Sequence, residues 1–141
     1  MDQASSMNNS EDFIELVGID NVKINQGTSK ADIIVKDIFT DDSGKIAPGI
    51  IFTLADSIAG INSIATCGNK MATLSSNISY FSEKECHGKK VYAMAKLIRN
   101  HEIFKVSEVT VTNEDEKVIA KGLFTFSNLF MKYENFPYEI N

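Results

Sequence analysis

The stretch that decides the fold runs from residue 47 to residue 60 and reads APGIIFTLADSIAG. Its character continues to residue 65, and ten of the sixteen residues from Ile50 to Ala65 are apolar. Because these side chains are spread around the helix instead of forming one stripe, they predict a helix that is buried on most sides. Pro48 fits the first turn, where a missing N–H has no intrahelical partner, and Gly68 is a typical helix end.

Small and polar residues form a thin seam along this predicted helix, at helical spacing. The seam consists of Thr53, Asp56, Ser57, Gly60 and Ser63. Asp56 is its only acid, and apolar surroundings would disfavour the charge of its carboxylate and make it a stronger base. Asp56 is therefore a candidate catalytic residue. The other interpretation is a helix acid that faces solvent or pairs with a lysine.

Strand patterns lie on both sides of the helix. A short helix, with Ser10 as its N-cap, is predicted to end at Gly18. Alternation of apolar and polar residues between turn-forming clusters predicts strands at 22–24, 30–39, 71–81, 90–99, 102–112 and 118–128. The last four are expected to follow one another as hairpins. Antiparallel strands with one helix laid across a face make an α+β layer.

The 141 residues suit a single domain. We expect a disordered polar tail at 1–9, one domain at 10–129 and an aromatic, acidic tail at 130–141. One sheet cannot cover a helix that is apolar all round. A second subunit is the natural cover, so the pattern predicts a homodimer.

Composition argues against several classes of protein. Fourteen basic and nineteen acidic residues give a net charge of −5, which disfavours a nucleic-acid partner. The two cysteines and two histidines have no metal-ligand spacing, so no metal site is expected. The first residues lack a secretory signal pattern, and no apolar run approaches the roughly 20 residues of a membrane span. The chain is therefore expected to be reduced, soluble and cytoplasmic.

Three stretches resemble the PaaI-like acyl-CoA thioesterases of phenylacetate degradation: GKIAPGIIFTLADSIAGINSIA at 44–65, TLSSNISYFS at 73–82 and AKGLFTF at 120–126. The resemblance extends over residues 12–129 and implies the hotdog fold, an antiparallel sheet wrapped around one long central helix. It implies hydrolysis of an acyl-CoA thioester, with no cofactor beyond the coenzyme A of the substrate. It also implies homodimers, often paired into homotetramers, with active sites at the subunit interface.

The resemblance assigns roles to individual residues. The family's acid falls on Asp56, which would be a general base for water or a nucleophile. Thr73 carries the hydroxyl that assists across the interface. Asp41 stands where a loop asparagine holds the water or the carbonyl, and as an acid it could raise the pKa of Asp56. Arg99 and Lys105 flank a predicted hairpin turn and could meet the phosphates of coenzyme A, although charges at hairpin ends are usually just solvated.

The start of the helix departs from the family motif. His-Gly-Gly is replaced by Ala47-Pro48-Gly49. Pro48 has no N–H to offer the thioester oxygen, and losing one such donor typically costs about 2.7–4 kcal/mol of barrier. Gly49 or Ile50 could donate in its place, beside Pro48 in the substrate-binding first turn.

These departures keep other functions open. Ala47 and Pro48 favour the alternative of a non-catalytic acyl-CoA-binding or assembly-forming hotdog protein. A hotdog dehydratase is disfavoured, because no histidine lies in or beside the helix to act as its base. The polar seam of the helix points to a short or aromatic acyl chain.

Overall fold

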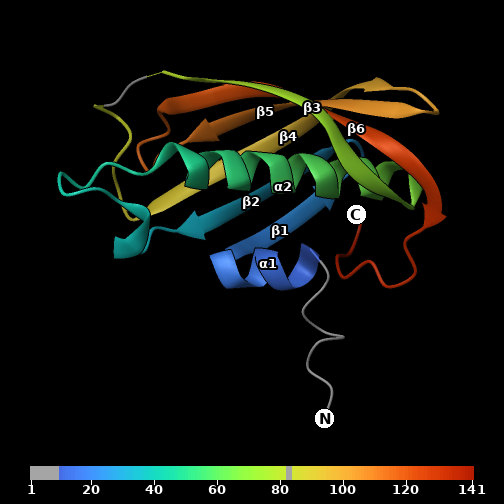
Figure 1. The fold of residues 1–141 in the computed structure, drawn as a ribbon, viewed down its shortest axis with the longest axis horizontal. Coiled ribbons are helices and arrows are strands. Elements are labelled where there is room, and N and C mark those ends of the chain that lie inside the picture. The colour runs from blue at the N-terminus through green and yellow to red at the C-terminus, as the bar shows by residue number, and fades with distance from the viewer. Residues whose placement is uncertain (1–9, 82–83) are drawn as a thin grey trace, which may run out of the picture.

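The predicted helix-among-strands pattern forms one curved antiparallel sheet with a long helix across it (Figure 1). The computed structural model describes residues 10–81 and 84–141. The predicted tail at 1–9 lies outside these residues, as does the side chain of Ser10. The elements are α1 (Ser10–Val17), β1 (Ile19–Asn25), β2 (Thr28–Ile34), the short 3₁₀ helix η2 (Asp37–Phe39), α2 (Pro48–Cys67), β3 (Asn69–Tyr80), β4 (Lys90–Asn100), β5 (Phe104–Thr112) and β6 (Val118–Lys132).

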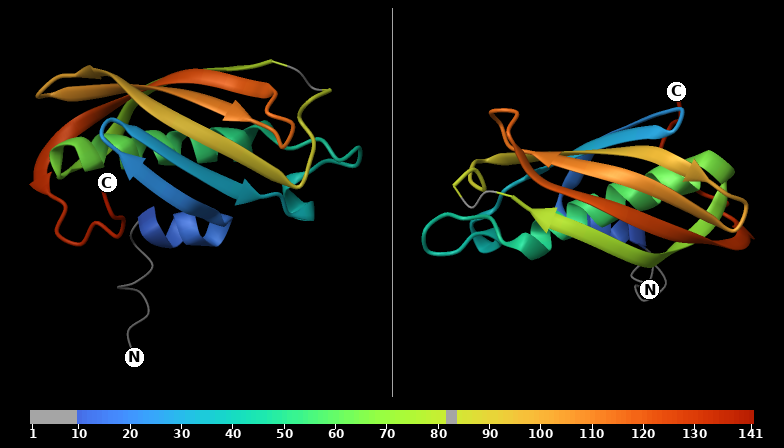
Figure 2. Two further views of the ribbon diagram at one scale, coloured as in Figure 1. Left: turned by 180° about the vertical axis from the view of Figure 1, so that it is seen from behind. Right: turned by 90° about the horizontal axis from the view of Figure 1, so that it is seen from above.

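The six strands stand in the order β1-β2-β4-β5-β6-β3, and every neighbouring pair is antiparallel. The sheet wraps around α2, with β1 and β3 at opposite edges (Figure 2). Helix α1 lies beside β1 at one edge of the layer (Figure 1). The predicted α+β hotdog architecture is therefore confirmed.

Two sequence-based predictions about the strands are wrong. The stretch 30–39 is not one strand: β2 ends at Ile34, and Thr40 bonds back to the carbonyl of Asp37 through its hydroxyl and its N–H, at 2.8 and 3.1 Å, closing a 3₁₀ turn. The last four strands are also not a run of hairpins. Strand β3 pairs with β6, with Ile78 opposite Gly122, and β4 lies between β2 and β5.

Helix α2 is fixed on the sheet by apolar packing and by one buried polar cluster. Leu54, Ala55 and Ile58 are fully buried among the inward-facing side chains of the sheet. The amide of Asn62 joins the helix to β2 and β5, because its Oδ1 accepts from the Ser29 hydroxyl at 2.7 Å and its Nδ2 donates to the Ser107 hydroxyl at 3.2 Å. A buried, satisfied polar cluster of this kind sets the register of helix against sheet.

The end of α2 is the one predicted. Gly68 adopts a left-handed conformation with φ of +76°, and its N–H donates to the carbonyl of Ile64 at 2.7 Å. Glycine adopts this conformation without the penalty that a Cβ would bring. The helix is thereby closed and the chain turns directly into β3.

By length and composition alone, α2 would also be long and apolar enough to cross a membrane. The expectation that no apolar run approaches the length of a membrane span is therefore wrong. Half of the residues in its most apolar 18-residue window are buried inside the fold, where α2 packs along the sheet. A core helix passes the same test of length and composition, so this match is weak support for a membrane span.

Candidate functional site

Asp56 lies in a cavity of about 390 Å³ between α2 and the β3 edge of the sheet. Its Oδ1 accepts a hydrogen bond of 3.0 Å from the hydroxyl of Thr73 on β3. This bond lies within one chain, whereas the resemblance assigns the Thr73 hydroxyl a role across the subunit interface, and that role stays a prediction. The remaining lining residues are mostly apolar or aromatic: Phe13 and Ile14 of α1, Phe52, Thr53, Ser57, Gly60 and Ile64 of α2, Met71 of β3 and Phe126 of β6.

The environment of Asp56 makes its carboxylate a stronger base than usual. Burial raises the pKa of Asp56 above its ordinary value of 3.8, and the hydrogen bond from Thr73 offsets part of this rise. Asp41 is not among the causes of the shift, contrary to the expectation from sequence. Among residues 10–81 and 84–141, no lysine or arginine forms an ion pair with Asp56.

The predicted polar seam of α2 is mostly a cavity wall. Thr53, Asp56, Ser57 and Gly60 all line the cavity, as a shared helix face predicts. Ser63 does not: it is fully buried, and its hydroxyl donates to the carbonyl of Ala59 at 2.9 Å.

At Gly60 an aromatic ring lies close to the helix backbone. A Cβ at Gly60 would stand 3.0 Å from the ring of Phe126, so the absence of a side chain lets that ring lie across the helix. Sequence reasoning missed Phe13 and Phe126 as lining residues. The only signal in the sequence was that each is an aromatic residue within a predicted helix or strand.

The first turn of α2 leaves one backbone donor free. Its N-cap, Ala47, has no side-chain acceptor, and Pro48 has no N–H. The N–H of Ile50 donates to the carbonyl of Ala47 at 3.0 Å. Within the described part of the chain, the N–H of Gly49 meets no acceptor, and a Cβ at this position would touch nothing within 4 Å. Of the two substitutes expected for Pro48, Gly49 is therefore the available one.

A tyrosine of β3 contacts the same turn. The hydroxyl of Tyr80 donates to the carbonyl of Pro48 at 3.3 Å, and both residues line a smaller cavity of about 240 Å³ at the start of α2. Burial raises the pKa of Tyr80 above 10.0, so its hydroxyl stays protonated and remains a donor at neutral pH. No role for Tyr80 was predicted from the sequence.

Asp41 is engaged within its own loop. Its Oδ1 accepts from the N–H and the hydroxyl of Ser43, at 2.8 and 2.6 Å, and from the N–H of Lys45 at 3.0 Å. These bonds lower the pKa of Asp41, with the Ser43 hydroxyl as the largest cause. The carboxylate therefore shapes the loop before α2, and its predicted contact with water or substrate stays a prediction.

The two predicted phosphate contacts differ in placement. Arg99 is exposed near the end of β4, and its role stays a prediction. Lys105 is only 4% exposed, and its ammonium donates to the side chain of Asn100 at 2.7 Å and to the carbonyl of His101 at 3.0 Å. Because this ammonium holds the β4–β5 turn together, we do not retain Lys105 as a phosphate ligand.

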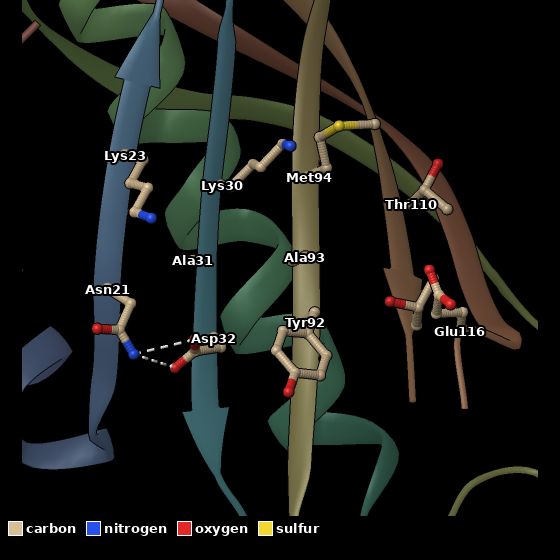
Figure 3. Close-up of a pocket in the computed structure, with 11 residues that line it drawn as sticks. Asn21, Lys23, Lys30, Ala31, Asp32, Tyr92, Ala93, Met94, Thr110 and Glu116 are labelled. Atoms are coloured by element: carbon tan, nitrogen blue, oxygen red, sulfur yellow. Dashed lines mark hydrogen bonds between the residues drawn. The ribbon is translucent and has the colours of Figure 1, made fainter. Parts of the chain in front are cut away.

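A further depression, of about 430 Å³, lies on the sheet face turned away from α2 (Figure 3). Two of its lining residues bond to each other, since the amide of Asn21 donates to both carboxylate oxygens of Asp32 at 3.0 Å, and the ammonium of the nearby Lys90 lies 3.7 Å from one of these oxygens. None of the predicted catalytic residues lines it. Among the described residues, no three His, Cys, Asp or Glu side chains cluster as a metal site would require.

Solved structures confirm the fold. A conserved protein from Pseudomonas aeruginosa is 25% identical, covering 91% of this chain and 100% of its own, with a TM-score of 0.77. A Streptococcus mutans UA159 protein, solved with acetyl CoA bound, is 29% identical over 80% of this chain and 92% of its own, with a TM-score of 0.69. The PaaI protein from the phenylacetic acid degradation operon of E. coli is 15% identical over 92% of each chain, with a TM-score of 0.78. No family model and no curated protein sequence matches the chain.

Proposed function

We propose that this protein is an acyl-CoA thioesterase in which Asp56 activates the attacking water. The observation that carries the proposal is a part-buried carboxylate with a raised pKa, which lies in an apolar cavity two turns from a free helix N–H. Hotdog neighbours support it, since one was solved with acetyl CoA and another is PaaI. The aromatic rings of Phe13, Phe52 and Phe126 in the cavity favour a short or aromatic acyl group.

The proposed chemistry needs a base and an oxyanion donor. The carboxylate of Asp56 takes a proton from water while the water oxygen bonds to the thioester carbonyl carbon. The carbonyl electrons move onto oxygen, which the N–H of Gly49 and the positive end of α2 stabilise. The intermediate then collapses, the C–S bond breaks, and the proton passes from Asp56 to the leaving thiolate. The products are a carboxylic acid and coenzyme A.

Asp56 could instead attack the carbonyl carbon directly, as a nucleophile. In this route the Asp56 oxygen bonds to the carbonyl carbon, the C–S bond breaks, the thiolate of coenzyme A leaves, and a mixed anhydride remains on the enzyme. A single turnover in ¹⁸O-labelled water tests this route. Direct water attack places ¹⁸O in the first molecule of acid released, whereas water that opens the anhydride at the Asp56 carbonyl gives first-turnover acid without the label and leaves the label on the enzyme carboxylate.

The proposed site is shared between two subunits. Strand β3 is an edge strand whose residues are mostly exposed, including Leu74 with 64% exposure. A long open edge of this kind is a template for pairing with another chain, so we propose a homodimer through β3. Light scattering after size-exclusion chromatography should give a molar mass at least twice that of one chain. Leu74→Asp should shift this mass toward that of a single chain. A wild-type protein of single-chain mass would contradict the shared site.

A panel of acyl-CoAs, with released thiol detected, tests the function. Wild-type protein should release coenzyme A fastest from short or aromatic acyl-CoAs. The alternative, an acyl-CoA-binding protein without hydrolysis, is favoured by Ala47 and Pro48 in place of the motif residues. Calorimetric binding of the same panel separates the two. Tight binding without thiol release above the background rate would refute the thioesterase and support the alternative.

A further inference from the structure

We infer that Tyr80 is a positioning residue that orients the Gly49 N–H toward the thioester oxygen, an inference that rests on the proposed function. The hydroxyl of Tyr80 donates to the carbonyl of Pro48 at 3.3 Å. That carbonyl and the N–H of Gly49 belong to one peptide group, which is planar and moves as a unit. Tyr80 therefore contacts one end of the group whose other end is the free donor.

The hydrogen bond acts on this donor in two ways. A bond accepted at the oxygen of an amide polarises the amide and strengthens its N–H as a donor. The bond also ties the first turn of α2, which lacks a side-chain cap, to β3. Helix ends otherwise fray, and a frayed turn would not hold Gly49 in one direction. The ring of Pro48 already fixes φ at that residue, so the tie restrains the motion that remains.

Strand β3 thereby contacts α2 at both halves of the proposed site. The hydroxyl of Thr73 binds Asp56, the base, and the hydroxyl of Tyr80 binds the peptide group of the oxyanion donor. The two contacts follow opposite chain directions, since residue 73 meets residue 56 and residue 80 meets residue 48. One strand at the exposed edge therefore sets the position of both the base and the donor.

The test compares Tyr80→Phe with the matched control Tyr92→Phe, whose ring lies on the opposite face of the sheet. Each substitution removes one hydroxyl and keeps the ring, and thermal melting checks that both variants fold. In ¹⁵N-labelled full-length protein, the Gly49 amide signal should shift in Tyr80→Phe and stay in place in Tyr92→Phe. In the thiol-release assay, Tyr80→Phe should lower kcat about 3- to 10-fold, the range for one hydrogen bond, with little change in KM.

The outcomes separate this inference from the proposed function. An unmoved Gly49 signal in Tyr80→Phe, or an unchanged kcat in an active enzyme, overturns the role of Tyr80 and leaves the thioesterase intact. A loss of activity seen only as a higher KM also overturns it, because a donor that acts on the transition state affects kcat. Wild-type protein that releases no thiol from any acyl-CoA refutes the thioesterase itself, and the role of Tyr80 in catalysis with it.

Discussion

Replacing Ala47 with threonine should stabilise the fold and slow the reaction at the same time. Ala47 is the N-cap of α2, and alanine is among the poorest residues at that position because it offers no acceptor. A threonine hydroxyl there would accept from the N–H of the second or third helical residue, here Gly49 or Ile50. The Ile50 N–H is already bonded to the carbonyl of residue 47, so the hydroxyl would meet the free Gly49 N–H.

The gain in stability and the loss of rate both follow from the free energy of an N-cap hydrogen bond. A new N-cap hydrogen bond is worth about 1 kcal/mol, which corresponds to a rise in Tm of about 3 °C for a chain of this length. The oxyanion would have to displace the hydroxyl from Gly49, so at least the same free energy is added to the barrier. That is about a fivefold loss of kcat. Complete loss of the donor would reach about 10²- to 10³-fold.

Ala47→Val is the matched control, since valine has the shape of threonine without the acceptor. Differential scanning calorimetry and thiol release are measured on both variants, and amide exchange shows whether the Gly49 N–H becomes protected. We expect Ala47→Thr to have a higher Tm, a slower exchange of the Gly49 amide and a lower kcat than Ala47→Val. A variant in which Gly49 is protected while kcat equals that of Ala47→Val would refute Gly49 as the oxyanion donor.

Three further changes test other parts of the site. Thr73→Val removes the bond that holds the pKa of Asp56 down, so the acid limb of the kcat profile should move to higher pH; an unmoved limb counts against Asp56 as the base. The folded-state pKa of Asp56 lies above its unfolded value, so its charge costs stability at neutral pH. Asp56→Asn should therefore melt higher than wild type at pH 7, with the difference fading toward pH 3, and a lower Tm at pH 7 would contradict the burial argument. Pro48→Gly should cost about 0.4–1 kcal/mol of stability and leave kcat nearly unchanged, whereas a gain near 10²-fold would mean that Gly49 does not serve as donor.

Helix α2 and the position of Asp56 on it could be predicted from the sequence because the patterns that indicate them are local. The apolar spread around 50–65, the proline at the start and the glycine at the end are each set by a few neighbouring residues. The same holds for the face shared by Thr53, Asp56, Ser57 and Gly60, which follows from helical spacing alone.

Contacts between segments that lie far apart in the sequence could not be predicted from local patterns. That β3 pairs with β6 instead of β4 depends on pairing between segments about 50 residues apart, and no local pattern encodes it. The burial of Lys105 depends on acceptors from a turn that forms only in the fold. The contact of Tyr80 with Pro48 likewise joins two elements whose angle the alternation of a strand does not fix.

The measurement that tests the central claim most directly is the kcat/KM of Asp56→Asn with the best acyl-CoA of the panel. Asparagine keeps the volume of the side chain and an oxygen for the Thr73 hydroxyl, but it cannot accept the proton of water. The account predicts a fall of about 10²- to 10⁴-fold, with the exposed loop variant Asp42→Asn as the control that stays at the wild-type rate. An Asp56→Asn protein that hydrolyses the thioester as fast as wild type would contradict it.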